Sequence, residues 1–250
     1  MADTTIVYSK EDHIAHIMLN RPEVANAINQ QLAQELKEAC CAINQDNDIY
    51  VVVLTGAGDR SFCIGVEPEP QASDIRHSVT QALAAIDRPV IAAINGDALS
   101  QGLELALSCD IRLATDKARF GFPEVAAGLI PMDGGTQRLP RIVGRAKALE
   151  LILTAETISA GEALEIGMVS KVAATEDLAA EALAMAQTIA SKGPIALRYA
   201  KEAVNKGLDL TLEQGVRLEA DLYFLLHTTA DRTEGIKAFL EKRAPQFKGQ

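Results

Sequence analysis

The sequence alternates short apolar runs with longer amphipathic stretches, and this alternation constrains the fold more than any other feature. Residues 49–54 (IYVVVL) and 90–94 (VIAAI) carry no charge and almost no polar group, which is typical of strands covered on both faces. Before the first of these runs, apolar side chains recur at helical spacing from Leu32 to Ile43, after Asn29. The pattern predicts an α/β fold with a buried sheet.

The alternation extends from the start of the chain to about Gly144. Residues 6–19 are predicted to form a hairpin, and residues 111–114 a further strand. Residues 99–108 are predicted to form a helix that is apolar on nearly every side. Beyond Gly144 we expect only helices, broken at glycines, so the C-terminal part should be a helical layer rather than a continuing sheet.

Composition excludes several classes of protein. With 250 residues, 48% of them hydrophobic, the chain can bury a core, and no apolar run is long enough to span a membrane. Residues 1–10 lack the basic flank and the apolar stretch of a signal peptide, so we expect a cytosolic protein. The formal net charge of -10 disfavours binding to nucleic acid or to anionic membranes.

Neither the cysteines nor the glycine-rich turn indicates a bound metal or nucleotide. Cys40, Cys41, Cys63 and Cys109 show no metal-binding spacing, so we expect reduced thiols in the interior rather than a zinc site or disulfides. The run 55–59 (TGAGD) follows a strand, but it lacks the third glycine of a dinucleotide-binding loop. A turn is the better interpretation.

Glu104 is the strongest candidate for a catalytic group. It lies within the predicted helix 99–108, whose other side chains are apolar nearly all round. Burial raises the pKa of a carboxyl group, which allows it to hold or accept a proton near neutral pH. The structural alternative is a buried carboxylate satisfied by an arginine.

Glu124 and two stretches of backbone complete the candidate site. Glu124 follows Pro123 in the first turn of a predicted helix, where a carboxylate can also serve only to complement the helix dipole. Residues 62–65 (FCIG) follow a strand and a turn, and residues 100–102 (SQG) begin the Glu104 helix. Both stretches can present backbone amides, and a pair of such amides can form an oxyanion hole.

In this order and separation, these segments resemble the crotonase (enoyl-CoA hydratase/isomerase) superfamily, whose members bind acyl-CoA thioesters and stabilise an enolate. The resemblance extends nearly from end to end. It is carried by residues 19–22 (LNRP), 61–65 (SFCIG), 95–99 (NGDAL), 102–105 (GLEL), 109–110 (CD), 120–124 (FGFPE), 134–139 (GGTQRL), 158–164 (ISAGEAL) and 193–194 (GP).

The resemblance implies a role for each matching residue. The amides of Ile64 and Gln101 would hold the thioester oxygen, while Glu104 and Glu124 would share one water and add it across the 2,3 double bond of an enoyl-CoA. This chemistry implies a lyase with no metal and no redox cofactor, because CoA enters as part of the substrate. An oxyanion held by two preorganised amides is where most of the barrier reduction should arise.

The resemblance also implies where CoA binds and how the chain assembles. A spiral of ββα turns would span residues 1–195, and residues 196–250 would form a helical trimerisation layer, giving trimers or pairs of trimers. The last helix would close over CoA, often from a neighbouring subunit, with Lys242 and Arg243 supplying positive charge. The expected CoA contacts are Val24, Ala25, Cys63, Val66, Glu67, Phe239 and Lys242.

Several positions depart from the pattern of hydratases. Relatives usually carry a small residue at position 64 and glycine at positions 100 and 101, but this chain has Ile64, Ser100 and Gln101. Met132 replaces another common glycine, and Asp133 follows it as a possible third acid. We therefore expect a reshaped pocket and an unusual acyl group, cyclic or conjugated.

Two alternatives to hydration stay open at this stage. An Asp-Gly-Gly at 133–135 resembles relatives in which the aspartate takes part in carbon–carbon bond chemistry, so the chain could be an isomerase or a ring-opening β-ketoacyl-CoA hydrolase that uses Asp133. The large residues at 64 and 101 would also suit a non-catalytic acyl-CoA-binding protein. Because both glutamates are present, hydration is the favoured prediction.

Overall fold

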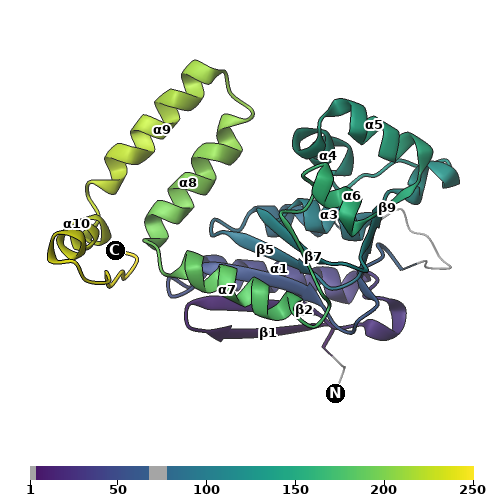
Figure 1. The fold of residues 1–250 in the computed structure, drawn as a ribbon, viewed down its shortest axis with the longest axis horizontal. Coiled ribbons are helices and arrows are strands. Elements are labelled where there is room, and N and C mark those ends of the chain that lie inside the picture. The colour runs from purple at the N-terminus through teal and green to yellow at the C-terminus, as the bar shows by residue number, and fades with distance from the viewer. Residues whose placement is uncertain (1–3, 68–77) are drawn as a thin grey trace.

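The computed structural model describes residues 4–67 and 78–250. These residues fold around two β-sheets (Figure 1). The larger sheet has the order β1-β2-β3-β5-β7-β10, and all its neighbours are parallel except β1 and β2. The smaller sheet has the order β4-β6-β8-β9, with only β8 and β9 antiparallel. The larger sheet consists of β1 (Ile6–Glu11), β2 (Ile14–Leu19), β3 (Val51–Gly56), β5 (Val90–Ile94), β7 (Ile111–Thr115) and β10 (Lys171–Ala173); the smaller of β4 (Ser61–Cys63), β6 (Asp97–Leu99), β8 (Arg119–Gly121) and β9 (Thr157–Ser159).

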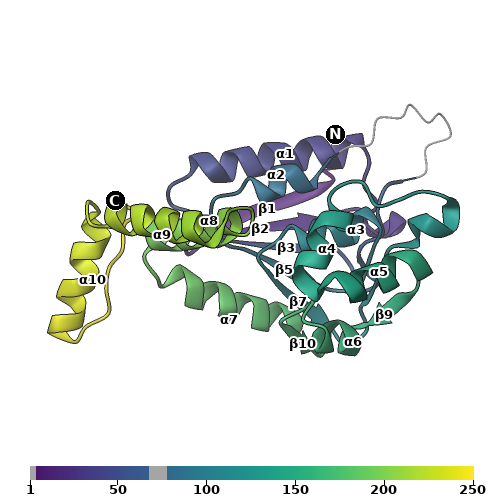
Figure 2. The same ribbon diagram turned by 90° about the horizontal axis from the view of Figure 1, so that it is seen from above.

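Helices cover both faces of the larger sheet, as its unbroken apolar strands predict. Helices α1 (Gln30–Gln45) and α7 (Leu178–Ala190) lie on opposite sides of it (Figure 2). Along β3, Val52 and Leu54 belong to the main core, while Val51 and Val53 pack with the apolar face of α7. This alternation follows from the two-residue period of a strand.

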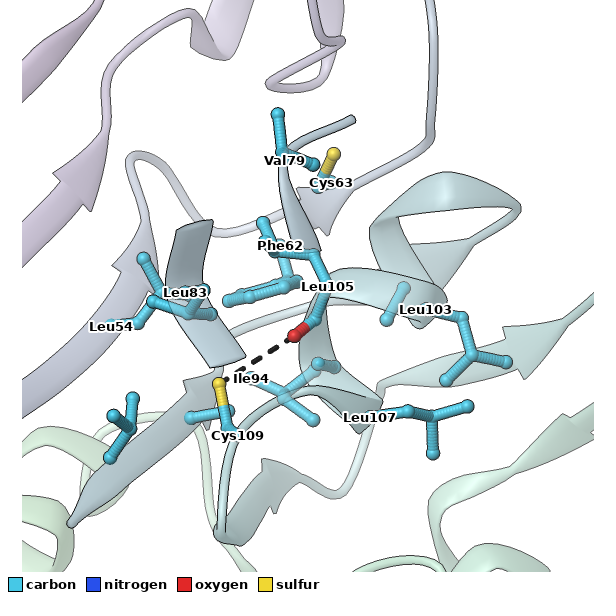
Figure 3. Close-up of a cluster of buried hydrophobic side chains, with 14 of the residues drawn as sticks. Leu54, Phe62, Cys63, Val79, Leu83, Ile94, Leu103, Leu105, Leu107 and Cys109 are labelled. Atoms are coloured by element: carbon cyan, nitrogen blue, oxygen red, sulfur yellow. Dashed lines mark hydrogen bonds between the residues drawn. The ribbon is translucent and has the colours of Figure 1, made fainter. Parts of the chain in front are cut away.

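Helix α3 (Gln101–Leu107) is buried along its whole length, which confirms the prediction for this segment. On one side, Leu105 packs among Phe62, Ile94 and Leu83 (Figure 3). The thiol of Cys109 donates a hydrogen bond to the carbonyl of Leu105 at 3.6 Å. A helix held in this way provides a rigid base for any group that it carries.

The remaining helices either flank the smaller sheet or extend beyond the core. Helices α8, α9 and α10 lie away from the two sheets (Figures 1 and 2). The ion pair of Lys201 with Asp110, at 2.7 Å, ties α8 to the core. The bounds are η1 (Pro22–Val24), α2 (Thr80–Ala84), η2 (Pro123–Ala127), α4 (Gly135–Val143), α5 (Arg145–Thr154), α6 (Ala160–Glu165), α8 (Pro194–Gly207), α9 (Leu212–Leu226) and α10 (Ala230–Glu241). The division at 195/196 stays a prediction, and it falls in the first turn of α8.

The expectation that strands end near Gly144 was wrong. Strand β9 pairs antiparallel with β8, and β10 pairs parallel with β7 at the edge of the larger sheet. Each has only three residues, which is too short for an alternating pattern to be visible in the sequence. Their position is set by the strands that they join rather than by their own side chains.

Other expectations concerned the cysteines and the membrane. Cys40, Cys63 and Cys109 are buried free thiols, but Cys41 is exposed, so the expectation of four interior thiols was wrong for that residue. On α1, Cys40 faces the core and its neighbour therefore points away. None of the helices in the described part of the chain is long and apolar enough to cross a membrane.

Candidate active site

The end of β4 and the start of α3 are in close backbone contact. A Cβ atom placed on Gly102 would lie 2.0 Å from the carbonyl oxygen of Cys63. One placed on Gly65, which has φ +100°, would lie 2.8 Å from the Cβ of Ser100 and 3.3 Å from the amide nitrogen of Gln101. Glycine is needed at both positions to let the chains approach. Residues 62–65 and 100–102, which the sequence predicts to form an oxyanion hole, are therefore in direct contact.

A small cavity of about 50 Å³ lies beside this contact. Six of its eight lining residues carry polar or charged side chains, and they come from β6–α3, from η2, from the segment after β4, and from the turns before α2 and α4. The lining residues are Val66, Ser78, Ser100, Gln101, Glu104, Glu124, Met132 and Asp133. Both predicted glutamates and the possible third acid thus share one cavity.

Glu104 is 2% exposed and is held by two backbone amides. Its Oε1 accepts hydrogen bonds from the amides of Asp133 at 2.8 Å and Gly135 at 2.7 Å. These amides belong to the turn that begins α4, where a carboxylate also complements the helix dipole. The structural alternative of an arginine partner does not apply, because no ion pair to Glu104 occurs in the described residues.

The surroundings of Glu104 favour its neutral form. Burial raises the pKa of this carboxyl to about 7, although the amide hydrogen bonds of Gly135 and Asp133 act in the opposite direction. The nearby charges of Asp133 and Glu124 add to the rise. A carboxyl with this pKa can exchange a proton with substrate or water near neutral pH.

Glu124 lies in η2, a short 3-10 helix that begins at Pro123, where the sequence predicts the start of a helix. The hydroxyl of Ser100 donates a hydrogen bond to its Oε1 at 2.6 Å. Its other oxygen, Oε2, is buried and has no hydrogen-bond partner within residues 4–67 and 78–250. Glu124 therefore has one oxygen fixed by Ser100 and one without a donor among the described residues.

Asp133 is surrounded by hydrogen-bond donors. Its carboxylate accepts bonds from the hydroxyls of Ser78 at 2.6 Å and Thr80 at 2.9 Å, and from the side-chain amide of Gln101 at 2.8 Å. The backbone amides of Val79 and Thr80 also donate to it. Burial on its own would raise the pKa of Asp133, but these bonds outweigh it and hold the pKa below its ordinary value. Such a carboxylate is suited to anchoring the chain rather than to donating a proton.

The sequence of the chain matches a known protein family over most of its length. The family model for enoyl-CoA hydratase/isomerase matches residues 9–250. The chain belongs to this family. Membership confirms the predicted superfamily and its fold.

Relatives and solved structures agree with this assignment. A crotonyl-CoA hydratase of Syntrophomonas wolfei is 41% identical over 99% of both chains. An (E)-benzylidenesuccinyl-CoA hydratase of Thauera aromatica is 40% identical over 95% of this chain and 96% of the relative. An enoyl-CoA hydratase from Bacillus anthracis superposes with a TM-score of 0.96 at 40% identity, covering 98% of this chain and 100% of the other. The predicted lyase of the enoyl-CoA hydratase type is thereby confirmed.

Four of the residues that the family resemblance assigned to CoA lie near one another. Ile28 and Val66 form a β-bridge, and the amide of Ile28 donates to the carbonyl of Gly65 at 2.7 Å. This pairing places the η1 segment, with Val24 and Ala25, beside residues 66 and 67. Glu67 forms an ion pair with Arg21 at 2.8 Å, so its charge is already neutralised.

Other residues assigned to CoA lie elsewhere. The side chain of Cys63 is fully buried in the core, so a contact with CoA would have to involve its backbone, and the CoA contact of this residue stays a prediction (Figure 3). Phe239 lies on α10 and Lys242 at its end, far from α3 in both views (Figures 1 and 2). The positive charge expected from Arg243 is offset within the single chain by ion pairs with Glu234 at 2.6 Å and Glu241 at 2.7 Å.

No metal-binding group is apparent in the part of the chain that the structure describes. Within residues 4–67 and 78–250, no three His, Cys, Asp or Glu side chains are grouped so that they could hold an ion. The sequence also predicts a loop at residues 67–70 (EPEP), which from position 68 onward lies outside the described residues. Sequence inspection missed the donors around the carboxylates, namely the amide of Gly135 and the hydroxyls of Ser78, Thr80 and Ser100.

Proposed function

We propose that the chain adds water across the 2,3 double bond of an enoyl-CoA, with Glu104 and Glu124 as the proton-transfer pair. The observation that carries this proposal is the buried Glu104, with a pKa of about 7, in one cavity with Glu124. Two carboxylates at one site can hold one water between them, one accepting its proton and the other supplying a proton. The charge of Glu124 also acts on Glu104, which supports their proximity.

In the proposed reaction, the thioester oxygen binds to the backbone amides of Ile64 and Gln101. The oxygen of water forms a bond to Cβ, its proton passes to one glutamate, and the electrons of the double bond move into the thioester as an enolate. The other glutamate then gives a proton to Cα, which restores the thioester. The close contact of β4 with α3 supports this assignment, because amides fixed before reaction stabilise the developing oxyanion without reorganisation.

Hydration can be measured directly with purified protein. The conjugated absorbance of crotonyl-CoA should fall as water adds, and a panel of cyclic and conjugated enoyl-CoA thioesters tests the unusual acyl group that we propose. A protein that binds these thioesters tightly and hydrates none would instead be a non-catalytic binder. That alternative was prompted by the large side chains of Ile64 and Gln101. In the structure they give it no support, because the side chain of Gln101 bonds to Asp133 and that of Ile64 is partly exposed.

Replacing Asp133 by asparagine is expected to lower the free energy of unfolding more than it raises the activation free energy of hydration. One carboxylate oxygen becomes an NH₂ group that faces donors from Ser78, Val79, Thr80 or Gln101, so unfolding should become easier by about 2 kcal/mol. We expect kcat to fall about tenfold, through the displaced amide that Asp133 donates to Glu104. Urea unfolding and hydration assays measure the two effects.

The same variant separates hydration from the Asp133-dependent alternatives. An isomerase or β-ketoacyl-CoA hydrolase that uses Asp133 would lose more activity in Asp133→Asn than in Glu104→Gln. The exposed Asp177, which makes no capping bond to α7, supplies a control, and Asp177→Asn should leave both properties unchanged. A larger loss from the aspartate variant would remove hydration as the leading function.

We also propose that the chain acts in the cytosol as a trimer or a pair of trimers, and the C-terminal helices support the assembly. Their exposed apolar side chains form a surface that water does not favour. Leu208, Leu212, Phe224, Phe239 and Leu240 are each at least 66% exposed in the single chain. A neighbouring copy would cover them and could bring its Phe239 and Lys242 to the CoA site.

Sedimentation equilibrium should therefore give three or six times the chain mass of 26.7 kDa. Leu212→Asp places a charge on the most exposed of these positions and should shift the mass towards the single chain. Leu212→Met keeps the apolar surface and should retain the assembly. A monomer of wild-type protein at micromolar concentration would contradict this part of the proposal.

A further inference from the structure

Ser100 adopts a backbone conformation that residues with a side chain rarely take. Its φ is 53° and its ψ is -133°. Other positive-φ residues with side chains, Ala25, Ala155 and Lys242, have ψ between 19° and 40° and lie in the ordinary left-handed region. The conformation of Ser100 belongs to a region used almost only by glycine. It costs stability, and the surrounding structure must hold it in place.

The contacts around Ser100 account for the fixed backbone. Its amide donates to the carbonyl of Gly121 at 3.0 Å, and its carbonyl accepts from the amides of Leu103 at 3.0 Å and Glu104 at 3.1 Å. Its side chain packs against Gly65, where a Cβ would lie 2.9 Å from the hydroxyl oxygen. A glycine at position 100 could make the same backbone bonds without strain. The strain therefore arises because position 100 carries a side chain, and what that side chain adds to the site is the hydroxyl.

We propose that Ser100 is a positioning residue for Glu124. Its hydroxyl donates to Oε1 of Glu124 at 2.6 Å, a short bond of the kind that a charged acceptor forms. This bond fixes the carboxylate on one side and leaves Oε2, which has no partner in the described residues, for the substrate water. The inference rests on the proposed hydration, in which Glu124 must present one oxygen to that water.

Two variants separate the hydroxyl from the strain. Ser100→Ala removes the hydroxyl and keeps a Cβ in the strained conformation, whereas Ser100→Gly removes both. Each should lower kcat about 10- to 100-fold, the range that corresponds to one hydrogen bond to a charged group, with KM changed less than threefold. The glycine variant should melt about 2–4 °C above the alanine variant, because the strain is relieved.

If Ser100 had only a structural role, the loss of kcat in Ser100→Gly would not depend on the residue at position 124. In the Glu124→Gln background, Ser100→Gly should lower kcat by less than twofold, because the group that the hydroxyl positions has already been altered. Ser108→Ala is the matched control, since that hydroxyl lies at the opposite end of α3 and donates to the carbonyl of Leu105 at 2.7 Å. Its kcat should equal that of the wild type. Equal losses from Ser100→Gly in both backgrounds would overturn the proposal.

A second measurement keeps this proposal separate from the hydration itself. The urea-unfolding free energies of the wild type, Ser100→Ala, Glu124→Gln and the double variant form a cycle that needs no substrate. Non-additive effects on unfolding would show that the hydroxyl holds the carboxylate even if no enoyl-CoA were hydrated. Additive effects would overturn the positioning role, whereas a wild type without hydratase activity would overturn only the proposed function.

Discussion

Glu104→Gln is expected to lower kcat for enoyl-CoA hydration by about 10²- to 10⁴-fold, the range lost when a positioned proton-transfer group is removed. Glutamine retains an oxygen that can accept from the amides of Asp133 and Gly135, so the local structure should persist. What disappears is the ability to exchange a proton near neutral pH. Initial rates of hydration measured at saturating substrate test this effect.

The same substitution should increase stability at high pH. The folded-state pKa of Glu104 is raised from 4.5 to about 7, so the folded chain binds this proton more tightly than the unfolded chain does. The stabilisation by the neutral form is complete below pH 4.5 and is lost as the pH rises through 7. Above pH 7, the ionised Glu104 should therefore make the free energy of unfolding of the wild type lower than that of Glu104→Gln, by on the order of 2 kcal/mol.

Urea unfolding of wild type and Glu104→Gln between pH 5 and pH 8.5 measures this divergence. The exposed Glu165 at the end of α6 provides a control, since Glu165→Gln should retain the kcat of the wild type. A Glu104→Gln protein with nearly full activity would exclude Glu104 from proton transfer. A stability difference that does not grow with pH would contradict the raised pKa.

Burial and periodicity in the sequence were enough to predict the core and to select Glu104. Helix α3 is apolar on every side but one, so a single carboxylate within it stands out, and the strands on which the core depends are long enough to show their pattern. Strands β9 and β10 were missed because three residues carry no period. Cys63 was assigned to CoA by resemblance, although β4 turns its side chain into the core.

The roles of the polar side chains around the site depend on contacts between distant segments. Asp133 contacts Ser78 and Thr80 across more than fifty positions of sequence, and Ser100 contacts Glu124 across 24. Nothing in either local pattern indicates such partners. The sequence therefore suggested Asp133 as a third acid without showing the donors that hold its carboxylate, and it marked Ser100 only as a departure from glycine.

Gly102→Ala is expected to have the largest effect on stability of any single methyl group added near the site. The new Cβ would lie 2.0 Å from the carbonyl oxygen and 2.5 Å from the carbonyl carbon of Cys63. Because both are backbone atoms of a buried strand, no side-chain rotation can make room, and either β4 or α3 must move. We expect a loss of about 3 kcal/mol or more in the free energy of unfolding, measured by urea titration.

Activity should fall further than stability alone requires, because the same movement separates the amides of Ile64 and Gln101. A displacement of about 1 Å in a positioned group can cost on the order of 10²-fold in rate. Gly161→Ala on α6 is the matched control, since the nearest atom, the hydroxyl oxygen of Ser159, lies 3.9 Å from the new Cβ. That variant should fold and hydrate substrate as the wild type does. If Gly102→Ala did the same, the close contact of β4 with α3 could not be what holds the two amides in place.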